Sequence, residues 1–328
     1  MHSLDHQVLS VLQNWVENNI QAWFCTIVRT HGSSPRPAGS LMACNQSGQV
    51  VGSLSGGCVE DDLLEKLQSG WFSRYPQLIE YGLSAEENAR LGLPCGGYMT
   101  VLVEQMGHSD LKDLVKINTA LGNRKCIERS LDLISGQRHL MPTEYFKPIA
   151  FNEHRFVQVY GPGYTLLLVG AGQIAGCLVQ MANMMDYRVL VTDPRADKLD
   201  DFKNHILAPS SDCECINQMP DDVVREYAND PFSIVITLTH DPRIDDMALM
   251  EALAQDNFYV GSLGSVRTTE NRIERLRQLQ LEEAQIARLH APVGLAIGSK
   301  TAPEIAVAIL AELTQMRRAQ EKVSPNRY

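Results

Sequence analysis

Two cysteines of this chain each adjoin a pair of glycines, and this arrangement is the clearest sign of chemistry in the sequence. Gly56-Gly57-Cys58 and Cys95-Gly96-Gly97 mirror each other. Glycine lets the backbone turn tightly and lets a bulky ligand approach a thiol, which a cysteine that only fills a core does not need. Cys58 also falls at a predicted helix start, where the dipole favours the thiolate, although Glu60-Asp61-Asp62 opposes that effect. The two thiols are therefore candidate cofactor-facing groups, with core packing as the alternative.

A second candidate site is the glycine turn that follows the apolar stretch Leu166–Val169. The residues Gly170, Gly172 and Ala175 fit the dinucleotide-binding pattern G-x-G-x-x-G/A. Its first glycine makes the turn, its second lets a pyrophosphate approach, and its small third residue packs helix against strand. The helix start at Gln173 offers free amides and a positive dipole end to a phosphate.

An acid follows this turn at the expected distance. Asp193 closes the next predicted strand, 23 positions after Gly170, where an acid would bind a ribose hydroxyl. Arg195 lies close to that ribose position, and no partner for hydride transfer is apparent. The pattern therefore predicts a Rossmann-like fold, and NAD(P) binding is the weaker expectation.

Three further features carry alternatives that the sequence leaves open. Arg36 lies between two prolines, and its forked guanidinium suits a phosphate or a pterin oxygen, or simply solvent. His290 precedes Ala291-Pro292-Val293-Gly294 and is either a binding residue or a structural hydrogen-bonding one. Cys213-Glu214-Cys215 has no second cysteine pair or histidine cluster, so we expect a polar loop there and no metal site.

Composition narrows the class of protein. The 328 residues are enough for two domains, and 44% hydrophobic with 21% charged residues is ordinary for a globular protein. The net charge of −10 argues against nucleic acid and anionic membranes as partners. The start lacks the pattern of a signal peptide, and no apolar run is long enough to span a membrane. We therefore expect a cytoplasmic protein whose eight cysteines are thiols.

The order of predicted elements indicates an α/β fold with an N-terminal small α/β domain and a C-terminal Rossmann-like parallel sheet domain. We expect the first domain over residues 1–106, a connecting helix and antiparallel strands over 107–163, the Rossmann-like domain over 164–320 and a flexible tail over 321–328. In the Rossmann-like domain strands are expected at Thr165–Val169, Arg188–Thr192, His205–Leu207, Ser233–Thr237 and Phe258–Gly261.

On these residues the chain resembles the xanthine dehydrogenase accessory family, of the XdhC/CoxI type. Ordered sequence blocks in both predicted domains carry the resemblance, and mainly the middle segment is unmatched. Lys300-Thr301 is a minor departure from the family's commoner small residue and threonine. The blocks are Gly32-Ser33-Ser34-Pro35-Arg36, Gly56-Gly57-Cys58-Val59-Glu60, Cys95-Gly96-Gly97, Gly170-Ala171-Gly172, Thr192-Asp193-Pro194-Arg195, Tyr259–Ser265, His290–Leu295 and Ile297–Ala306.

The resemblance implies a chaperone rather than a dehydrogenase. Such proteins bind the molybdenum cofactor, as molybdopterin or its dinucleotide form, protect it, and help its sulfurated form enter enzymes of the xanthine dehydrogenase class. The thiols of Cys58 and Cys95 would then face the cofactor. The implied cofactor-binding residues are Arg36, Gly56, Gly57, Gly96, Gly97, Gly170, Gly172, Gln173, Ala175, Asp193, Arg195 and His290.

The resemblance also implies partners. They are a molybdenum hydroxylase apoenzyme and a cysteine desulfurase or a cofactor nucleotidyltransferase. We further expect a homodimer, because an antiparallel middle segment often supplies an edge for pairing. The alternatives are an NAD(P)-dependent oxidoreductase and an adaptor that docks the target enzyme without binding a small molecule.

Overall fold

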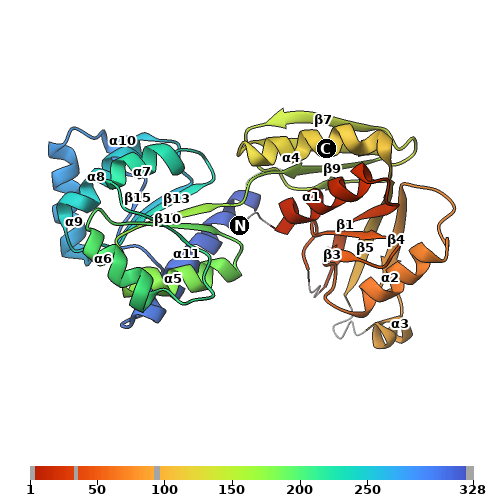
Figure 1. Ribbon diagram of the computed structural model, residues 1–328, viewed down its shortest axis with the longest axis horizontal. Coiled ribbons are helices and arrows are strands. Elements are labelled where there is room, and N and C mark those ends of the chain that lie inside the picture. Colours follow the sequence, from red (N-terminus) through yellow and green to blue (C-terminus); the bar gives the residue numbers. More distant parts are fainter. Residues whose placement is uncertain (1–3, 33–35, 92–96, 323–328) are drawn as a thin grey trace. The chain divides into compact units, whose positions relative to one another are not determined.

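The structure is a computed structural model that describes residues 4–32, 36–91 and 97–322 (Figure 1). The chain divides into two compact units, one from Leu4 to Pro162 and one that begins at Gly163. We call them the N-terminal unit and the Rossmann unit. No helix in the described ranges is long and apolar enough to cross a membrane.

A five-stranded antiparallel sheet forms the centre of the N-terminal unit, in the order β3-β2-β1-β5-β4. Successive side chains of a strand point to opposite faces, so the sheet has two cores. One face packs against α1 and α4, and the other packs against α2. The elements are α1 (Leu4–Glu17), β1 (Ala22–His31), β2 (Leu41–Asn45), β3 (Val50–Gly52), α2 (Cys58–Gln68), β4 (Gln77–Tyr81), α3 (Ala85–Arg90), β5 (Tyr98–Met106) and α4 (Leu111–Gly122).

A second antiparallel sheet completes this unit, in the order β7-β6-β9-β8. Its strands are β6 (Cys126–Asp132), β7 (Arg138–Thr143), β8 (Ala150–Phe151) and β9 (Arg155–Tyr160). Arg129 of β6 is 2.5 Å from Glu104 of β5, so a buried ion pair joins the two sheets. Antiparallel strands were expected within residues 107–163, and the structure has them there.

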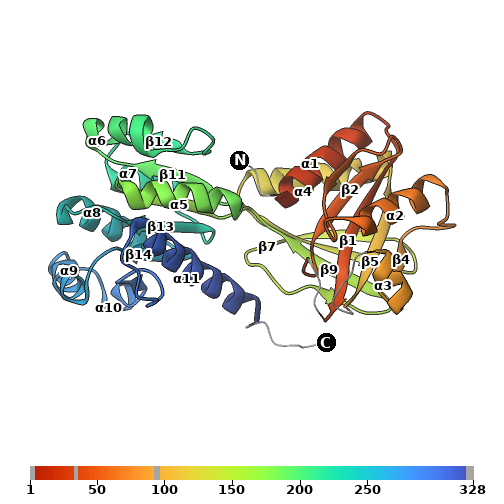
Figure 2. The ribbon, with the colours of Figure 1, turned by 90° about the horizontal axis from the view of Figure 1, so that it is seen from below.

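The Rossmann unit holds a six-stranded parallel sheet in the order β12-β11-β10-β13-β14-β15. Helices α5 and α11 cover one face, where they lie next to each other (Figure 2), and α7 and α8 pack on the other. The strands are β10 (Thr165–Val169), β11 (Arg188–Thr192), β12 (Glu214–Ile216), β13 (Ser233–Thr237), β14 (Tyr259–Ser262) and β15 (Leu289–His290). The helices are α5 (Gln173–Met184), α6 (Ala196–Asp201), α7 (Pro220–Tyr227), α8 (Pro242–Ala254), α9 (Val266–Gln278), α10 (Glu283–Ile286) and α11 (Ala302–Lys322).

This strand order places a topological switch point between β10 and β13. The chain builds outward from β10 to β12 and then returns to build β13, β14 and β15 on the other side. Ligands of open α/β sheets bind beyond the carboxyl ends of the strands at such a point. The predicted fold class, a small α/β part followed by a Rossmann-like parallel sheet, is confirmed.

The strand predicted at His205–Leu207 is wrong. The loop predicted at Cys213-Glu214-Cys215 is wrong for Glu214 and Cys215, which belong to β12, whereas Cys213 precedes that strand. Residues Phe202–Ile206 form a π-helical turn, because Phe202 and Ile206 recur at helical spacing and pack onto the core near α5. A Cβ added to Gly176 of α5 would come within 2.6 Å of Ile206 Cγ2. The third strand is β12, which is short and only partly buried because it pairs with β11 alone at the sheet edge.

Candidate functional site

The loop Ser53–Gly57, which leads into Cys58, wraps around the carboxylate of Glu60. Six donors of this loop bind the two carboxylate oxygens. Oε1 accepts from Ser53 Oγ at 2.7 Å and from the amides of Leu54, Ser55 and Gly56 at 2.9, 2.8 and 2.8 Å, and Oε2 accepts from Ser55 Oγ and from the Gly57 amide at 3.0 Å. Burial opposes ionisation of Glu60, but these bonds hold its pKa well below the usual range. The loop amides are therefore already satisfied within the chain.

Cys58 is the first residue of α2, and its side chain is exposed. Val59 and Leu63 of the same helix are buried and fix α2 on the sheet. A Cβ added to Gly56 or Gly57 would meet nothing within 4 Å, and Gly56 has φ +85°, which favours glycine. The glycine pair thus lets the loop close on Glu60 and leaves open space beside both glycines.

Cys95 and Gly96 lie outside the described residues, so their role toward the cofactor stays a prediction. Gly97 is buried, and a Cβ added to Gly82 would come within 2.5 Å of the Gly97 carbonyl oxygen. On the other side of residues 92–96, Arg90 of α3 donates to Asp62 of α2 at 2.9 Å. Both described flanks of this segment are therefore anchored on the elements around α2.

Replacing Glu60 by glutamine is expected to lower the free energy of unfolding of the N-terminal unit by about 2 kcal/mol, because hydrogen bonds to a charged acceptor are lost. Fluorescence during urea unfolding reports this unit, because Trp15, Trp23 and Trp71 are the chain's three tryptophans. The lowered pKa of Glu60 stabilises the fold above the unfolded-state pKa of about 4.3, and this contribution declines as the pH falls below it. Glu60→Gln should lose that acid dependence.

The matched control for this prediction is Glu65→Gln. Glu65 lies on the same helix and is exposed, so its replacement should change stability by less than about 0.5 kcal/mol. Equal effects of the two substitutions would contradict the role assigned to Glu60.

In the Rossmann unit, the glycine turn lies at the switch point with the geometry that the sequence pattern predicts. Gly170 has φ +113°, and a Cβ there would come within 2.8 Å of Thr239 Cγ2, so the loops after β10 and β13 touch. A Cβ on Gly172 would meet nothing within 4 Å, which leaves its outer side open. Ala175 is fully buried, and Gln173 is exposed at the first position of α5. Of the predicted residues, the structure gathers these four together with Asp193 and Arg195.

The carboxylate of Asp193 is already engaged. Oδ1 accepts from the Arg195 amide at 3.1 Å and Nε at 2.8 Å, and Oδ2 accepts from Arg195 Nη2 at 2.8 Å and the Ala171 amide at 3.1 Å. Burial would raise the pKa of Asp193, but the bonds from Arg195 and Ala171 outweigh it and lower that pKa. A ribose hydroxyl could reach the Asp193 carboxylate only by displacing part of its ion pair with Arg195. The Arg195 side chain itself is 40% exposed, so it stays accessible to a ligand.

A buried network behind the switch point was missed by the sequence reasoning. Thr239 Oγ1 donates to Asp245 Oδ1 at 2.6 Å, and Arg272 Nη2 lies 3.0 Å from Asp245 Oδ2. Arg272 Nη1 also donates to the Leu263 carbonyl at 3.2 Å. The side chains of Asp245 and Arg272 are 1% and 3% exposed. The network ties the loops after β13 and β14 together, and no motif in the sequence signals such a tertiary pairing.

His290 lies apart from the glycine turn. It belongs to β15, three strands from β10, and three strand spacings amount to roughly 14 Å. Its ring stacks on Tyr259 with centroids 4.3 Å apart, and Nδ1 lies 3.0 Å from Glu312 Oε1. These contacts support the structural alternative for His290. Arg36 is half-buried in the N-terminal unit, and its role toward a ligand stays a prediction.

Known proteins resemble the chain over both units. Residues 166–313 match the family model of the XdhC Rossmann domain, and residues 15–82 match that of the XdhC and CoxI family. A probable xanthine dehydrogenase subunit of Bacillus subtilis (strain 168) is 27% identical over 95% of this chain and 97% of its own. The molybdenum cofactor insertion chaperone PaoD of Escherichia coli (strain K12) is 26% identical over 91% of this chain and 84% of its own.

A solved structure shares the fold of the whole chain. It is the crystal structure of a xanthine dehydrogenase from Bacillus halodurans, with a TM-score of 0.74 and 27% identity, and the match covers 97% of each chain. The similarity therefore extends over both units.

Proposed function

Because the chain belongs to the XdhC and CoxI family, we propose that it binds the molybdenum cofactor as cargo, protects its sulfurated form and inserts it into a molybdenum hydroxylase of the xanthine dehydrogenase class. The observation that carries this proposal is the similarity to a molybdenum cofactor insertion chaperone, which extends over 84% of that protein and both units of this one. The similarity to a probable xanthine dehydrogenase component of Bacillus subtilis supports the same target class.

The loop Ser53–Gly57, which leads into Cys58, suits a sulfur-bearing cargo better than a phosphate. Its amides bind Glu60, so they are not free to hold an anion. What the loop offers is the exposed thiol of Cys58, which follows two glycines whose outer sides are open. We assign Cys58, with Cys95, to shielding the cofactor or exchanging its sulfur.

The Rossmann unit supplies the features that suit a phosphate. Gly172 is open on its outer side and caps the start of α5, where free amides and the positive end of the helix dipole favour a phosphate. The engagement of Asp193 by Arg195 disfavours the ribose contact that an NAD-dependent oxidoreductase needs. We assign Gly170, Gly172 and Gln173 to the cofactor phosphate.

The proposal includes the compartment, the oligomeric state and the partners expected from the sequence analysis. The chain would act in the cytoplasm as a homodimer, accept cofactor from a nucleotidyltransferase or sulfur from a cysteine desulfurase, and deliver the cofactor to the hydroxylase apoenzyme. Each of these partners can be tested by co-purification with the full chain.

The deciding experiment is mass spectrometry of the ligand released from anaerobically purified protein. A pterin accompanied by molybdenum supports the chaperone, whereas NADH turnover without a pterin supports an oxidoreductase. Capture of the target enzyme with no bound small molecule supports an adaptor. Each of the last two results would overturn the proposal.

The thiol role is tested by activation of the apoenzyme. Cys58→Ser is expected to reduce activation at least about tenfold, which corresponds to about 1.4 kcal/mol, because the exposed thiol is lost while α2 and its loop are kept. Cys177→Ser, a partly buried cysteine of α5, serves as the control and should activate normally. Unchanged cofactor binding and activation in a Cys58→Ser, Cys95→Ser double variant would exclude this role.

A further inference from the structure

The tripeptide Asp-Pro-Arg occurs twice in the Rossmann unit, as Asp193-Pro194-Arg195 and as Asp241-Pro242-Arg243. The first copy follows β11 and the second follows β13, and these two strands are the neighbours of β10 in the sheet. Each copy therefore lies at the carboxyl edge of the sheet, on one side of the glycine turn that follows β10. The sequence reasoning gave a role to the first copy only.

The two copies have the same geometry. In each, the Asp Oδ1 accepts from the Arg amide and from Nε, and the Asp Oδ2 accepts from Nη2. The three distances are 3.1, 2.8 and 2.8 Å for Asp193 with Arg195, and 3.0, 3.1 and 2.8 Å for Asp241 with Arg243. A bidentate pair of this kind fixes the plane of the guanidinium. We call the two copies the first and the second arginine clamp.

Both clamps are joined to the glycine turn itself. In the first clamp, Asp193 Oδ2 also accepts from the amide of Ala171, inside the turn, at 3.1 Å. The second clamp is joined through Thr239, whose Oγ1 accepts from the Asp241 amide at 3.1 Å. Thr239 in turn lies against Gly170, where an added Cβ would come within 2.8 Å of its Cγ2. The turn is thus held from both sides.

The two clamps are also close to each other. The strands β11 and β13 are two strand spacings apart, which amounts to roughly 10 Å. Hydrogen bonds from Arg243 lower the pKa of Asp241, and the charge of Arg195 lowers it further. The charge of the first clamp therefore acts on the second.

Each clamp keeps donors for a ligand. Pairing through Nε and Nη2 uses one edge of a guanidinium and leaves the edge formed by Nη1 and Nη2. Within the described residues, neither Nη1 has a hydrogen-bond partner, and the side chains of Arg195 and Arg243 are 40% and 88% exposed. Such an edge matches two oxygens of one phosphoryl group. The chain therefore offers two phosphoryl-binding edges beside one glycine turn.

We propose that the two arginine clamps form a diphosphate-binding site, in which Arg195 holds one phosphoryl group of a pyrophosphate ester and Arg243 holds the other. The ligand lies across the switch point, where open α/β sheets bind dinucleotides. The aspartates fix both guanidinium groups before binding, so less conformational entropy is lost when the ligand arrives. They also offset the charge of each arginine, so one clamp alone holds a single phosphate weakly. A ligand that engages both clamps is therefore preferred.

This site bears on the form of the cargo, a consequence that rests on the proposed function. Molybdopterin itself carries one phosphate, whereas its dinucleotide form contains a pyrophosphate. The first form engages one clamp and the second engages both. The two clamps therefore favour the dinucleotide form of the cofactor.

The test is calorimetric titration of the full chain with ADP-ribose and with AMP at pH 8. Both probes carry about two negative charges at this pH, on two phosphoryl groups in ADP-ribose and on one in AMP. ADP-ribose should bind at least about tenfold more tightly than AMP, which corresponds to about 1.4 kcal/mol. Because total charge is matched, this difference reports the second phosphoryl group.

Two variants connect the preference to the clamps. Arg243→Ala should weaken the binding of ADP-ribose at least about tenfold and remove most of its advantage over AMP, because bonds between charged groups are lost. The Arg243 side chain is 88% exposed, so the fold does not depend on it. Arg195→Lys keeps a charge beside the buried Asp193 but lacks the planar fork, and it should weaken ADP-ribose binding to a similar extent.

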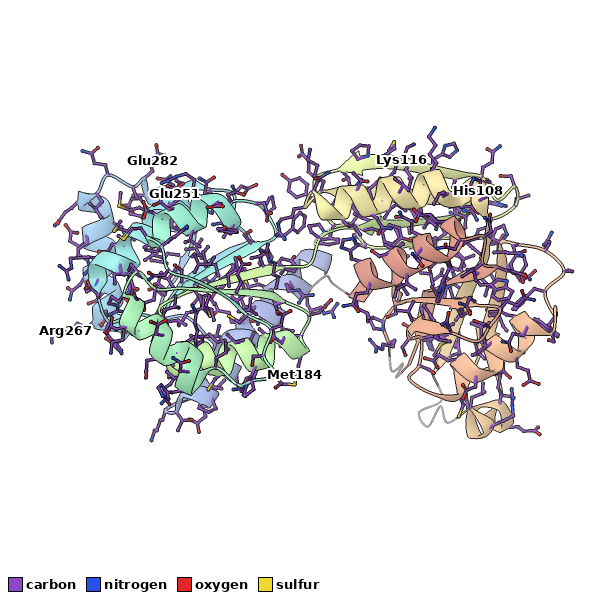
Figure 3. All side chains as sticks on the ribbon, viewed as in Figure 1. His108, Lys116, Met184, Glu251, Arg267 and Glu282 are labelled. Carbon is purple, nitrogen blue, oxygen red and sulfur yellow. The ribbon has the colours of Figure 1, made fainter. Side chains whose placement is uncertain are left out.

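Arg277→Ala is the matched control. Arg277 lies on α9, the helix whose Arg267 is labelled in Figure 3, and its side chain is 48% exposed. It pairs with Glu283 through Nε at 2.7 Å and Nη2 at 3.3 Å, as the arginines of the clamps pair with their aspartates. Equal affinities for the two probes, no binding of ADP-ribose, or an Arg243→Ala loss no larger than that of Arg277→Ala would each overturn the proposal.

Failure of this site and failure of the proposed function give different results. A pterin released from the purified chain in its monophosphate form would overturn the preference for the dinucleotide form and leave the chaperone role intact. Release of no pterin would overturn the chaperone role, whereas the titrations with ADP-ribose and AMP would still decide whether the diphosphate site exists.

Discussion

Replacing Arg272 by leucine is expected to lower the free energy of unfolding of the Rossmann unit by about 3–5 kcal/mol, because the carboxylate of Asp245 would remain buried without its counter-charge. Burial already raises the pKa of Asp245 and lowers that of Arg272, so each charge depends on the other. The substitution also removes the bond to the Leu263 carbonyl and should loosen the loops that follow β13 and β14. Hydrogen exchange measured over residues 237–241 and 263–265 would detect the loosening directly.

The chain contains a closely matched control for this substitution. Arg275 lies one turn further along α9 and binds Asp246 through Nε and Nη2 at 2.5 and 3.0 Å. The Arg275 side chain is 33% exposed, against 3% for Arg272. Arg275→Leu should therefore cost only about 1 kcal/mol. Equal losses for the two variants would show that burial does not decide the effect.

A second variant separates the unpaired charge from the loss of packing. If the cost of Arg272→Leu comes from the orphaned carboxylate, adding Asp245→Leu should recover most of the lost stability, since paired buried charges can be replaced by apolar groups at little cost. Failure of the double variant to recover stability would assign the loss to packing instead. Both outcomes concern the stability of the loops after β13 and β14, which lie beside the proposed phosphate site.

The sequence predicted the parts of the fold that local patterns encode. Leu166–Val169, Gly170 and the helix from Gln173 were recognised because an apolar strand, a glycine turn and a helix follow one another within a few residues. The strand near Glu214 was not, because two of its three residues are polar or small and it pairs on one side only. A strand at a sheet edge buries little, so its pattern resembles that of a loop.

For the candidate sites, too, the sequence revealed local features and missed those that depend on tertiary packing. The glycine pair beside Cys58 indicated an accessible thiol, and the thiol is exposed. That Glu60 organises the loop could have been foreseen, because its donors lie three to seven residues before it. The pairing of Asp245 with Arg272 could not, since 27 residues separate the two and only the packing of α8 and α9 brings them together.

Replacing Glu104 by glutamine is expected to destabilise the N-terminal unit by about 3–4 kcal/mol, because Arg129 would then be a fully buried cation without its main counter-charge. Glu104 lies 2.5 Å from Arg129 and 3.0 Å from Arg138, and its own side chain is fully buried. Burial opposes both charges, yet their attraction lowers the pKa of Glu104 and raises that of Arg129. Arg138 would keep its ion pair with Asp110 at 2.5 Å. Arg129 is therefore the residue that would lose its counter-charge.

Glu128→Gln is the control for this substitution, because Glu128 lies next to Arg129 on β6 and pairs with the exposed Lys147 at 2.7 Å. It should change stability by less than about 1 kcal/mol in the same fluorescence-monitored urea titration. A control loss as large as that of Glu104→Gln would contradict the assignment.

The pH dependence provides the sharper test of this ion pair. Because the pKa of Glu104 is lowered by folding, its stabilisation is complete above the unfolded-state value of about 4.3 and is lost as the pH falls toward the folded-state pKa. The unmodified chain should therefore lose stability of its N-terminal unit steeply below that value, and Glu104→Gln should flatten this loss. A variant as acid-sensitive as the unmodified chain would move the origin of the effect to Glu60, whose carboxylate has the same sign of shift. Measuring both variants therefore shows how much of the acid sensitivity comes from Glu60, which binds the loop Ser53–Gly57, and how much from Glu104, which joins the two sheets.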